Sequence, residues 1–109
     1  YNMRGELEAS FGLCEARHDY PVKECIFPET IPVFAFARQE IEAREILEPL
    51  CHRGLRRLVI YASGCIPALL SVINVAQKLK IREVVVMHFD SIKGDYQAQH
   101  IVTSNDIMW

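Results

Sequence analysis

Two short segments combine residue types and spacings that could support chemistry. The first, Ser63-Gly64-Cys65, follows a continuous apolar run and precedes Pro67, a residue suited to the first turn of a helix. Ser63 is a candidate N-cap, and Gly64 allows a sharp turn there. The free N–H groups of such a helix start attract an anion such as phosphate, so we expect ligand binding at 63–65. Cys65 is also a candidate nucleophile, while capping without any ligand is the simpler alternative.

The second segment is His88-Phe89-Asp90, at the end of another apolar run. His88 and Asp90 are two positions apart, so their side chains leave a strand on the same side. His88 would then be a general acid or base oriented by Asp90. The alternative is a half-buried His88 and an Asp90 that opens a turn. We place Tyr61 and Lys93 on the same rim as further ligand-binding candidates.

The elements on either side of these two segments predict that Ser63-Gly64-Cys65 and His88-Phe89-Asp90 lie close together in the fold. Residues 58–62 and 83–89 are apolar runs typical of strands covered on both faces, and 68–80 has the pattern of a helix. A strand, a helix and a second strand of this length form a right-handed βαβ unit with parallel strands. The carboxyl ends of parallel strands share one edge of a sheet, where ligands bind in open α/β folds.

The rest of the chain extends this unit into a single domain over 1–109. A strand at 31–37 and a helix from Gln39 to the stop at Gly54 complete a β-α-β-α-β series. The sequence therefore predicts an α/β, Rossmann-like three-layer sandwich, with a mostly parallel sheet and antiparallel edge strands. We expect residues 1–30 to form an added β-hairpin or edge segment, and 96–102 to return as an edge strand.

Composition excludes several classes of protein. Half of the 109 residues are apolar and the formal net charge is −2, which is typical of a globular domain and gives no strong nucleic-acid signal. No apolar run is long enough to span a membrane, so we expect no membrane partner. The cysteines form no Cys-x-x-Cys pair, which favours reduced thiols, a cytoplasmic protein, no metal site and no cofactor. These four residues are Cys14, Cys25, Cys51 and Cys65.

The helix at 68–79 is apolar over most of its circumference, and Ser71, Asn74, Gln77 and Lys78 interrupt this pattern. A helix of this kind is either deeply buried or half of a subunit interface. We therefore expect a homodimer that forms through the 68–79 helix.

From Leu58 onward, the order of an apolar strand, Ser-Gly-x-x-Pro, an apolar helix and a strand ending in His-Phe-Asp resembles the core of small CRISPR-accessory proteins with a CRISPR-associated Rossmann fold. The likeness covers about a third of the chain. It implies that the turn contacts a cyclic oligoadenylate and that two Ser63 turns meet in a homodimer. In that family the turn usually has a second Gly and a Lys or Arg, whereas this chain has Cys65 and Ile66-Pro67 at those places.

Three functions follow as hypotheses. The first is a ligand-sensing or regulatory domain that binds a phosphate-bearing molecule, such as a nucleotide or cyclic oligonucleotide, at 63–65. The second is a small enzyme that uses His88 and Asp90, or Cys65, at the same sheet edge. The third is a non-catalytic assembly subunit whose 68–79 helix forms the working surface.

Overall fold

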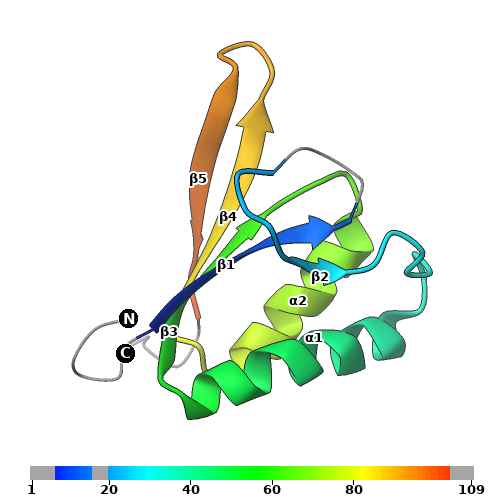
Figure 1. Cartoon of the computed structure of the whole chain (residues 1–109), viewed down its shortest axis with the longest axis vertical. Helices are drawn as coiled ribbons and strands as arrows, with labels where there is room; N and C mark the ends of the chain where they lie inside the picture. Colours follow the sequence, from blue (N-terminus) through cyan, green and yellow to red (C-terminus); the bar gives the residue numbers. More distant parts are fainter. Residues whose placement is uncertain (1–6, 16–19, 104–109) are drawn as a thin grey trace.

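The computed structural model describes residues 7–15 and 20–103, which form one five-stranded sheet and two helices (Figure 1). The order along the sheet is β2-β1-β3-β4-β5, in which β2, β1, β3 and β4 are mutually parallel and β5 is antiparallel to β4. This arrangement confirms the α/β class with a mostly parallel sheet and an antiparallel edge strand. The elements are β1 (Leu7–Cys14), β2 (Cys25–Phe27), α1 (Phe36–His52), β3 (Leu55–Tyr61), α2 (Ile66–Lys78), β4 (Glu83–Asp90) and β5 (Asp95–Ile101).

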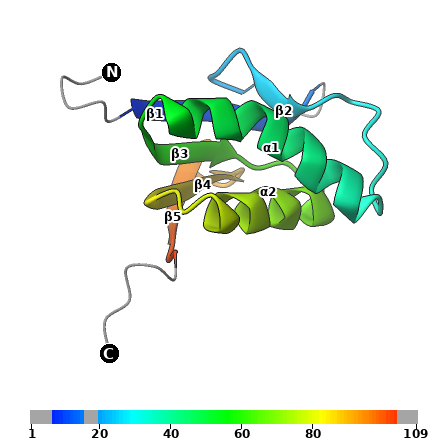
Figure 2. The ribbon, with the colours of Figure 1, turned by 90° about the horizontal axis from the view of Figure 1, so that it is seen from below.

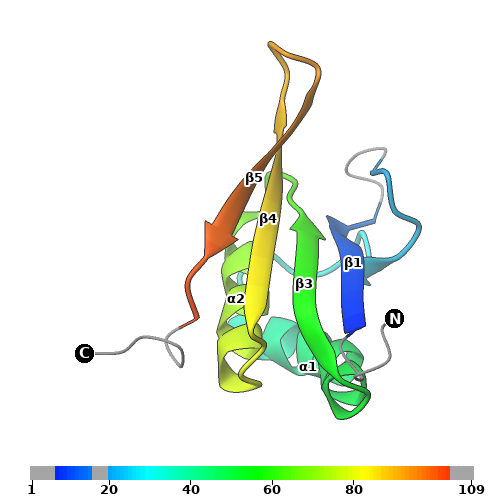
Figure 3. The same cartoon turned by 90° about the vertical axis from the view of Figure 1, so that its left-hand side faces the viewer.

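Both helices cover the same face of the sheet (Figures 2 and 3). The connections β2–α1–β3 and β3–α2–β4 both advance in one direction across the sheet, and right-handed crossovers then place their helices on one side. A three-layer sandwich has helices on both faces of the sheet, whereas the two helices of the described residues form one layer on a single face. On the opposite face, Tyr20 of the β1–β2 connection packs against Gly12.

The N-terminal segment is more central than the sequence indicated. Strand β1 lies between β2 and β3 and is parallel to both, so a hairpin within residues 1–30 is wrong, although β2 does form an edge. Alternate residues of β1, such as Phe11 and Leu13, enter the core under the helices. A hairpin requires antiparallel neighbours. Strand β1 instead pairs mainly with the parallel strand β3, which begins more than forty residues later.

The strand expected at 31–37 is also wrong. Ile31 is buried, but the residues after it form a loop that leaves Phe34 78% exposed, and helix α1 then begins at Phe36. The helix contains Pro49 and continues to His52, and Gly54 ends it with a φ of 97°. This last feature confirms Gly54 as the helix stop.

The central βαβ unit confirms the sequence-based arrangement. Ile60 of β3 pairs with Val86 of parallel β4, and both are buried. The apolar residues of α2 mostly face the core, where Ala68, Val72 and Ala76 are fully buried. No helix in the described part of the chain is long and apolar enough to cross a membrane. Strands β4 and β5 continue as a two-stranded hairpin beyond the ends of the other strands (Figure 1).

An ion pair on the outer side of the two helices gives a test that depends on pH. Lys78 Nζ lies 2.8 Å from Oε1 of Glu40, and Asn74 donates to Oε2 at 3.4 Å. Led by the Lys78 hydrogen bond, these contacts hold the pKa of Glu40 below its ordinary value of 4.5. A lowered carboxyl pKa contributes stability that is complete above the ordinary pKa and is lost as the pH falls through the folded-state pKa.

We therefore expect Lys78→Met to lower the free energy of unfolding at neutral pH by less than about 1 kcal/mol, because the pair is partly exposed. In strong acid, where Glu40 is protonated, the substitution should have a smaller effect. Urea unfolding at both pH values measures the difference, and equal losses at the two would contradict this role for the pair.

Candidate functional site

The Ser63 turn and the end of β4 line one surface hollow. The last β3–β4 pair is Tyr61 with Met87, and the Ala62 amide continues the ladder by donating to the Met87 carbonyl at 2.9 Å. The chain leaves β3 at this point, while β4 runs on. The hollow that results has a volume of about 390 Å³ and is lined by Ala62, Ser63, Gly64, Ile66, Leu69, His88 and Phe89.

The turn before α2 is open and uncapped. The N-cap of α2 is Cys65, and no side chain of the described residues caps the helix, so the expectation that Ser63 is the N-cap is wrong. Helix α2 starts two residues after Gly64, too late for Ser63 to hold the N-cap position. Pro67 lies in the first turn, as predicted. Nothing lies within 4 Å of the place where a Cβ of Gly64 would be, so a ligand can approach this backbone closely.

The Cys65 side chain lies apart from this opening. It is 6% exposed and belongs to the hydrophobic core with Ala68 and Ile60. The backbone of Cys65 begins the helix, but the residue does not line the hollow. A buried thiol of this kind packs as a small apolar side chain.

His88 and Asp90 have separate partners. The His88 ring is exposed at the hollow, and its Nε2 lies 2.8 Å from Oε1 of Gln99 on β5. Asp90 Oδ1 instead accepts hydrogen bonds from the backbone N–H groups of Ile92 and Lys93, at 3.0 and 3.2 Å. Asp90 thus opens the β4–β5 turn, and Gln99 is the residue positioned to orient His88.

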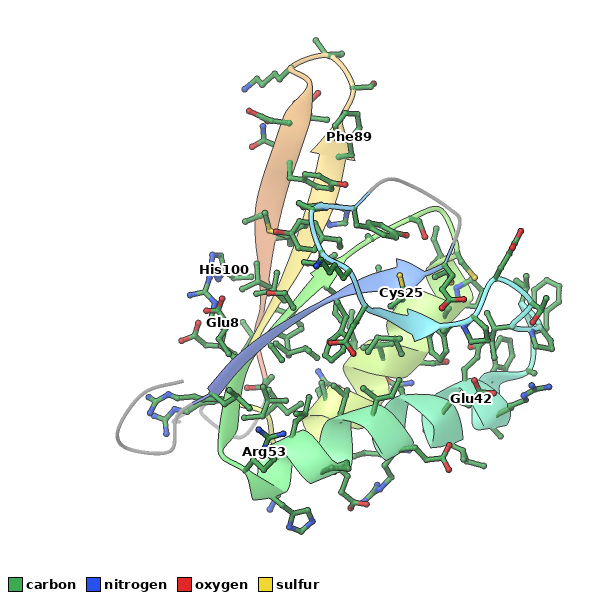
Figure 4. The ribbon with its side chains drawn as sticks, in the orientation of Figure 1. Glu8, Cys25, Glu42, Arg53, Phe89 and His100 are labelled. Atoms are coloured by element: carbon green, nitrogen blue, oxygen red, sulfur yellow. The ribbon has the colours of Figure 1, made fainter. Side chains whose placement is uncertain are left out.

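Tyr61 and Lys93 lie outside the hollow. The Tyr61 ring makes an edge contact with Tyr96 of β5, with ring centroids 5.0 Å apart. Tyr96 also contacts Phe89, at 5.4 Å, so these three rings form one aromatic cluster beside the hollow. Lys93 is exposed in the turn that joins β4 to β5, beyond Phe89, which Figure 4 labels on the extended part of this hairpin.

Tyr20 is a residue near the site that the sequence did not single out. Its ring lies on the backbone of Gly12 in β1, and its hydroxyl lies beside Ser63 and the backbone of Cys14. Burial raises the pKa of Tyr20, and hydrogen bonding to Ser63 and to the Cys14 backbone opposes that rise. The sequence feature that could have indicated this contact is Gly12, because a glycine within a strand often marks a place where another group approaches the backbone closely.

The cysteines and the described acidic and histidine residues form no cluster that could be a metal site. All four cysteines are free, and burial raises the pKa of the Cys25 and Cys51 thiols. A higher pKa leaves less thiolate, which is the form that binds metals and attacks electrophiles. Within residues 7–15 and 20–103 no group of three or more His, Cys, Asp or Glu residues is close enough to hold a metal ion.

No protein-family model matches the chain, and no curated protein or solved structure matches it either. Fold and site therefore define the class: an α/β domain with a Rossmann-like, mostly parallel sheet and an open hollow at the carboxyl edge of β3 and β4.

Proposed function

We propose that this domain binds a small phosphate-bearing molecule in the hollow between the Ser63 turn and the end of β4. The observation that supports this most directly is the combination of an unobstructed Gly64 backbone with an uncapped α2 helix start in one hollow. The N-terminal end of a helix favours negative charge, and its first N–H groups can donate to phosphate oxygens.

The side chains around the hollow suit such a ligand. None of the residues that line it is acidic, so a phosphate entering it meets no lining carboxylate. His88 Nε2 lies 2.8 Å from Gln99 Oε1, so the ring has a second N–H to donate to a phosphate oxygen only in its protonated form. Ile66, Leu69 and Phe89 give an apolar wall for a planar group such as a nucleobase. A nucleotide combines these two chemistries, because it pairs an anionic phosphate with a flat ring.

The resemblance to small CRISPR-accessory proteins makes a cyclic oligoadenylate one form that this ligand could take. In that interpretation the phosphate lies at Gly64, and the backbone supplies contacts that a Lys or Arg in the turn would otherwise make. No lysine or arginine is among the residues lining the hollow. We therefore expect weaker salt dependence of binding than a basic phosphate site shows.

A thermal-shift titration tests this function. The probes are inorganic phosphate, mononucleotides and cyclic oligoadenylates, added to the protein and to two variants at Gly64. A ligand that binds only the folded state should raise the Tm of a domain of this size by roughly 10 °C at about 100 times its Kd. Gly64→Ala should give a smaller shift than the unmodified protein, because its methyl group occupies the space through which the ligand reaches the Gly64 backbone. Gly64→Leu should lose the shift because its side chain fills the hollow.

The Tm of each Gly64 variant without ligand serves as the control. The space around Gly64 predicts that neither substitution alters the Tm without ligand by more than a few degrees. If no probe raises the Tm, or if Gly64→Leu responds as strongly as the unmodified protein, the hollow is not the binding site.

The enzyme hypothesis has less support. Cys65 is buried, and Asp90 is bonded to the turn amides, so His88 is the remaining exposed candidate for acid–base catalysis. The chain's free cysteines fit the cytoplasmic location that we propose. We also propose that the protein is a homodimer, with the 68–79 helix contributing to the interface.

A further inference from the structure

Five exposed apolar side chains gather on the outer side of the two helices and define the helix-face patch. The patch consists of Phe34, Phe36, Ile41, Ile66 and Leu70, which are between 52% and 78% exposed. They supply five of the nine exposed large hydrophobic side chains in the described part of the chain. Scattered exposed apolar residues need no explanation, but a contiguous group of this kind marks an interaction surface.

The patch follows two adjoining grooves between the helices. Phe36 of α1 and Ile66 and Leu70 of α2 line one groove, which has a volume of about 360 Å³. A second groove of about 230 Å³ adjoins it at Glu40 and includes Ile41. The Phe34 ring extends the patch by an edge contact with Phe36, with centroids 6.3 Å apart. Figure 2 shows α1 and α2 side by side on this face.

Protrusions and grooves occur together on this one surface. Phe34 and Ile41 are 78% and 61% exposed, and both are adjacent to the grooves between the helices. In a two-fold symmetric dimer the same patch meets itself, so each copy must offer both shapes. The helix-face patch meets this condition, because the protruding side chains of one copy can enter the grooves of the other.

The charges within and beside the patch also permit two copies to meet. There are three ion pairs, with three cations and three anions: Arg38–Glu42 at 2.7 Å, Arg44–Glu48 at 3.1 Å and Lys78–Glu40 at 2.8 Å. Of these residues, Glu40, Arg44 and Lys78 line the grooves themselves. A face with balanced charges does not repel its own copy, and it offers no net charge to attract a strongly acidic or basic partner.

The area is also of the right size for such a contact. With roughly 150–250 Å² for a fully exposed side chain of this kind, the patch leaves on the order of 500–600 Å² of apolar surface in water. A standard interface buries about 800 Å² per partner, of which somewhat more than half is apolar. The patch and its polar border together reach this size.

We propose that a second copy of this chain docks on the helix-face patch, so that the helices of the two copies pack against each other and the two sheets lie outside. This inference deepens the homodimer proposed above and moves the interface. The contact surface is formed by the N-terminal halves of α1 and α2 with Phe34, whereas most apolar residues of 68–79 are buried within one copy.

The mass of the protein in solution tests the interface. Light scattering after gel filtration, at micromolar concentration, should give the mass of a dimer for the unmodified protein. Ile41→Glu and Leu70→Glu should each give a monomer, because every substitution occurs twice in a symmetric dimer and raises its Kd by roughly two to three orders of magnitude. The matched control is Ile92→Glu, since Ile92 is 95% exposed in the hairpin turn, outside the patch.

Three results would overturn the proposal: a monomeric unmodified protein at about 100 μM, dimeric Ile41→Glu and Leu70→Glu variants, or loss of the dimer in Ile92→Glu. Circular dichroism shows whether each variant is folded. Neither Ile41 nor Leu70 lines the ligand hollow. A monomeric variant that still gives the ligand-dependent thermal shift therefore separates the two proposals, as does a dimer that binds no probe.

Discussion

Gln39→Leu should lower the free energy of unfolding by about 2–4 kcal/mol, even though it places an apolar side chain in the core. Gln39 is completely buried, and its amide makes three hydrogen bonds. Nε2 donates to the carbonyl oxygens of Pro32 and Val33, at 2.8 and 2.9 Å, and Oε1 accepts from the Ser71 hydroxyl at 2.8 Å. Leucine has a similar volume but leaves all three of these groups without their partner.

Equilibrium unfolding in urea measures this loss, and Gln97→Leu is the matched control. Gln97 is exposed on β5, so its replacement should change the stability by less than about 0.5 kcal/mol. Ser71→Ala should cost about 1 kcal/mol, because it removes one of the three hydrogen bonds. The loss in the double variant should be smaller than the sum of the single losses, since the two residues share a bond. Equal effects of Gln39→Leu and Gln97→Leu would contradict the proposed role of Gln39.

Gln39 also explains why residues 31–37 do not form the strand that their sequence predicts. Their continuous run of apolar residues resembles a buried strand, but strand formation also needs a neighbour for its backbone groups. In the folded chain the Gln39 side chain takes two of those carbonyl groups, and helix α1 begins at Phe36. A bond between a side chain and a loop six or seven residues earlier has no periodic signature in sequence.

The central βαβ unit was predictable because its signals are local. Continuous apolar runs mark β3 and β4, and Pro67 marks the first turn of the helix between them. The parallel direction of the strands then follows from chain handedness. The place of β1 was not predictable in this way, because its partner strand begins about forty residues later and no local pattern selects it.

The candidate site likewise has some features with a local sequence signal and others without one. Ser63 and His88 line one hollow, as expected, since they come two residues and one residue after Tyr61 and Met87, the last paired positions of the adjacent parallel strands. Asp90 and Lys93 lie further along a hairpin that continues past the end of β3, a length that the sequence does not reveal. Cys65 turns into the core because α2 begins at the next residue, which sets the direction of its side chain.

Gly12→Ala should lower the free energy of unfolding by about 1–3 kcal/mol, whereas Gly64→Ala should leave it within about 0.5 kcal/mol. A Cβ at Gly12 would lie 2.5 Å from Cδ2 of Tyr20 and 2.9 Å from Sγ of Cys25, so the Tyr20 ring has to move. At Gly64 the same methyl group meets open space. Both substitutions restrict the unfolded chain equally, so their difference measures contacts of the folded state alone.

The decisive comparison adds Tyr20→Ala to Gly12→Ala. If the clash with the Tyr20 ring causes the loss, the double variant should be more stable than the sum of the single effects predicts, by about 1 kcal/mol or more. Displacing the ring also exposes its hydroxyl to water and so removes the burial that raises its pKa. Because burial outweighs the opposing hydrogen bonds, the pKa of Tyr20 in Gly12→Ala should fall back toward its ordinary value of 10.0. The ring-carbon NMR shift of Tyr20 reports that titration separately from the other tyrosines. Additive losses with an unchanged Tyr20 titration would mean that β1 and the Ser63 turn are joined by contacts other than this ring.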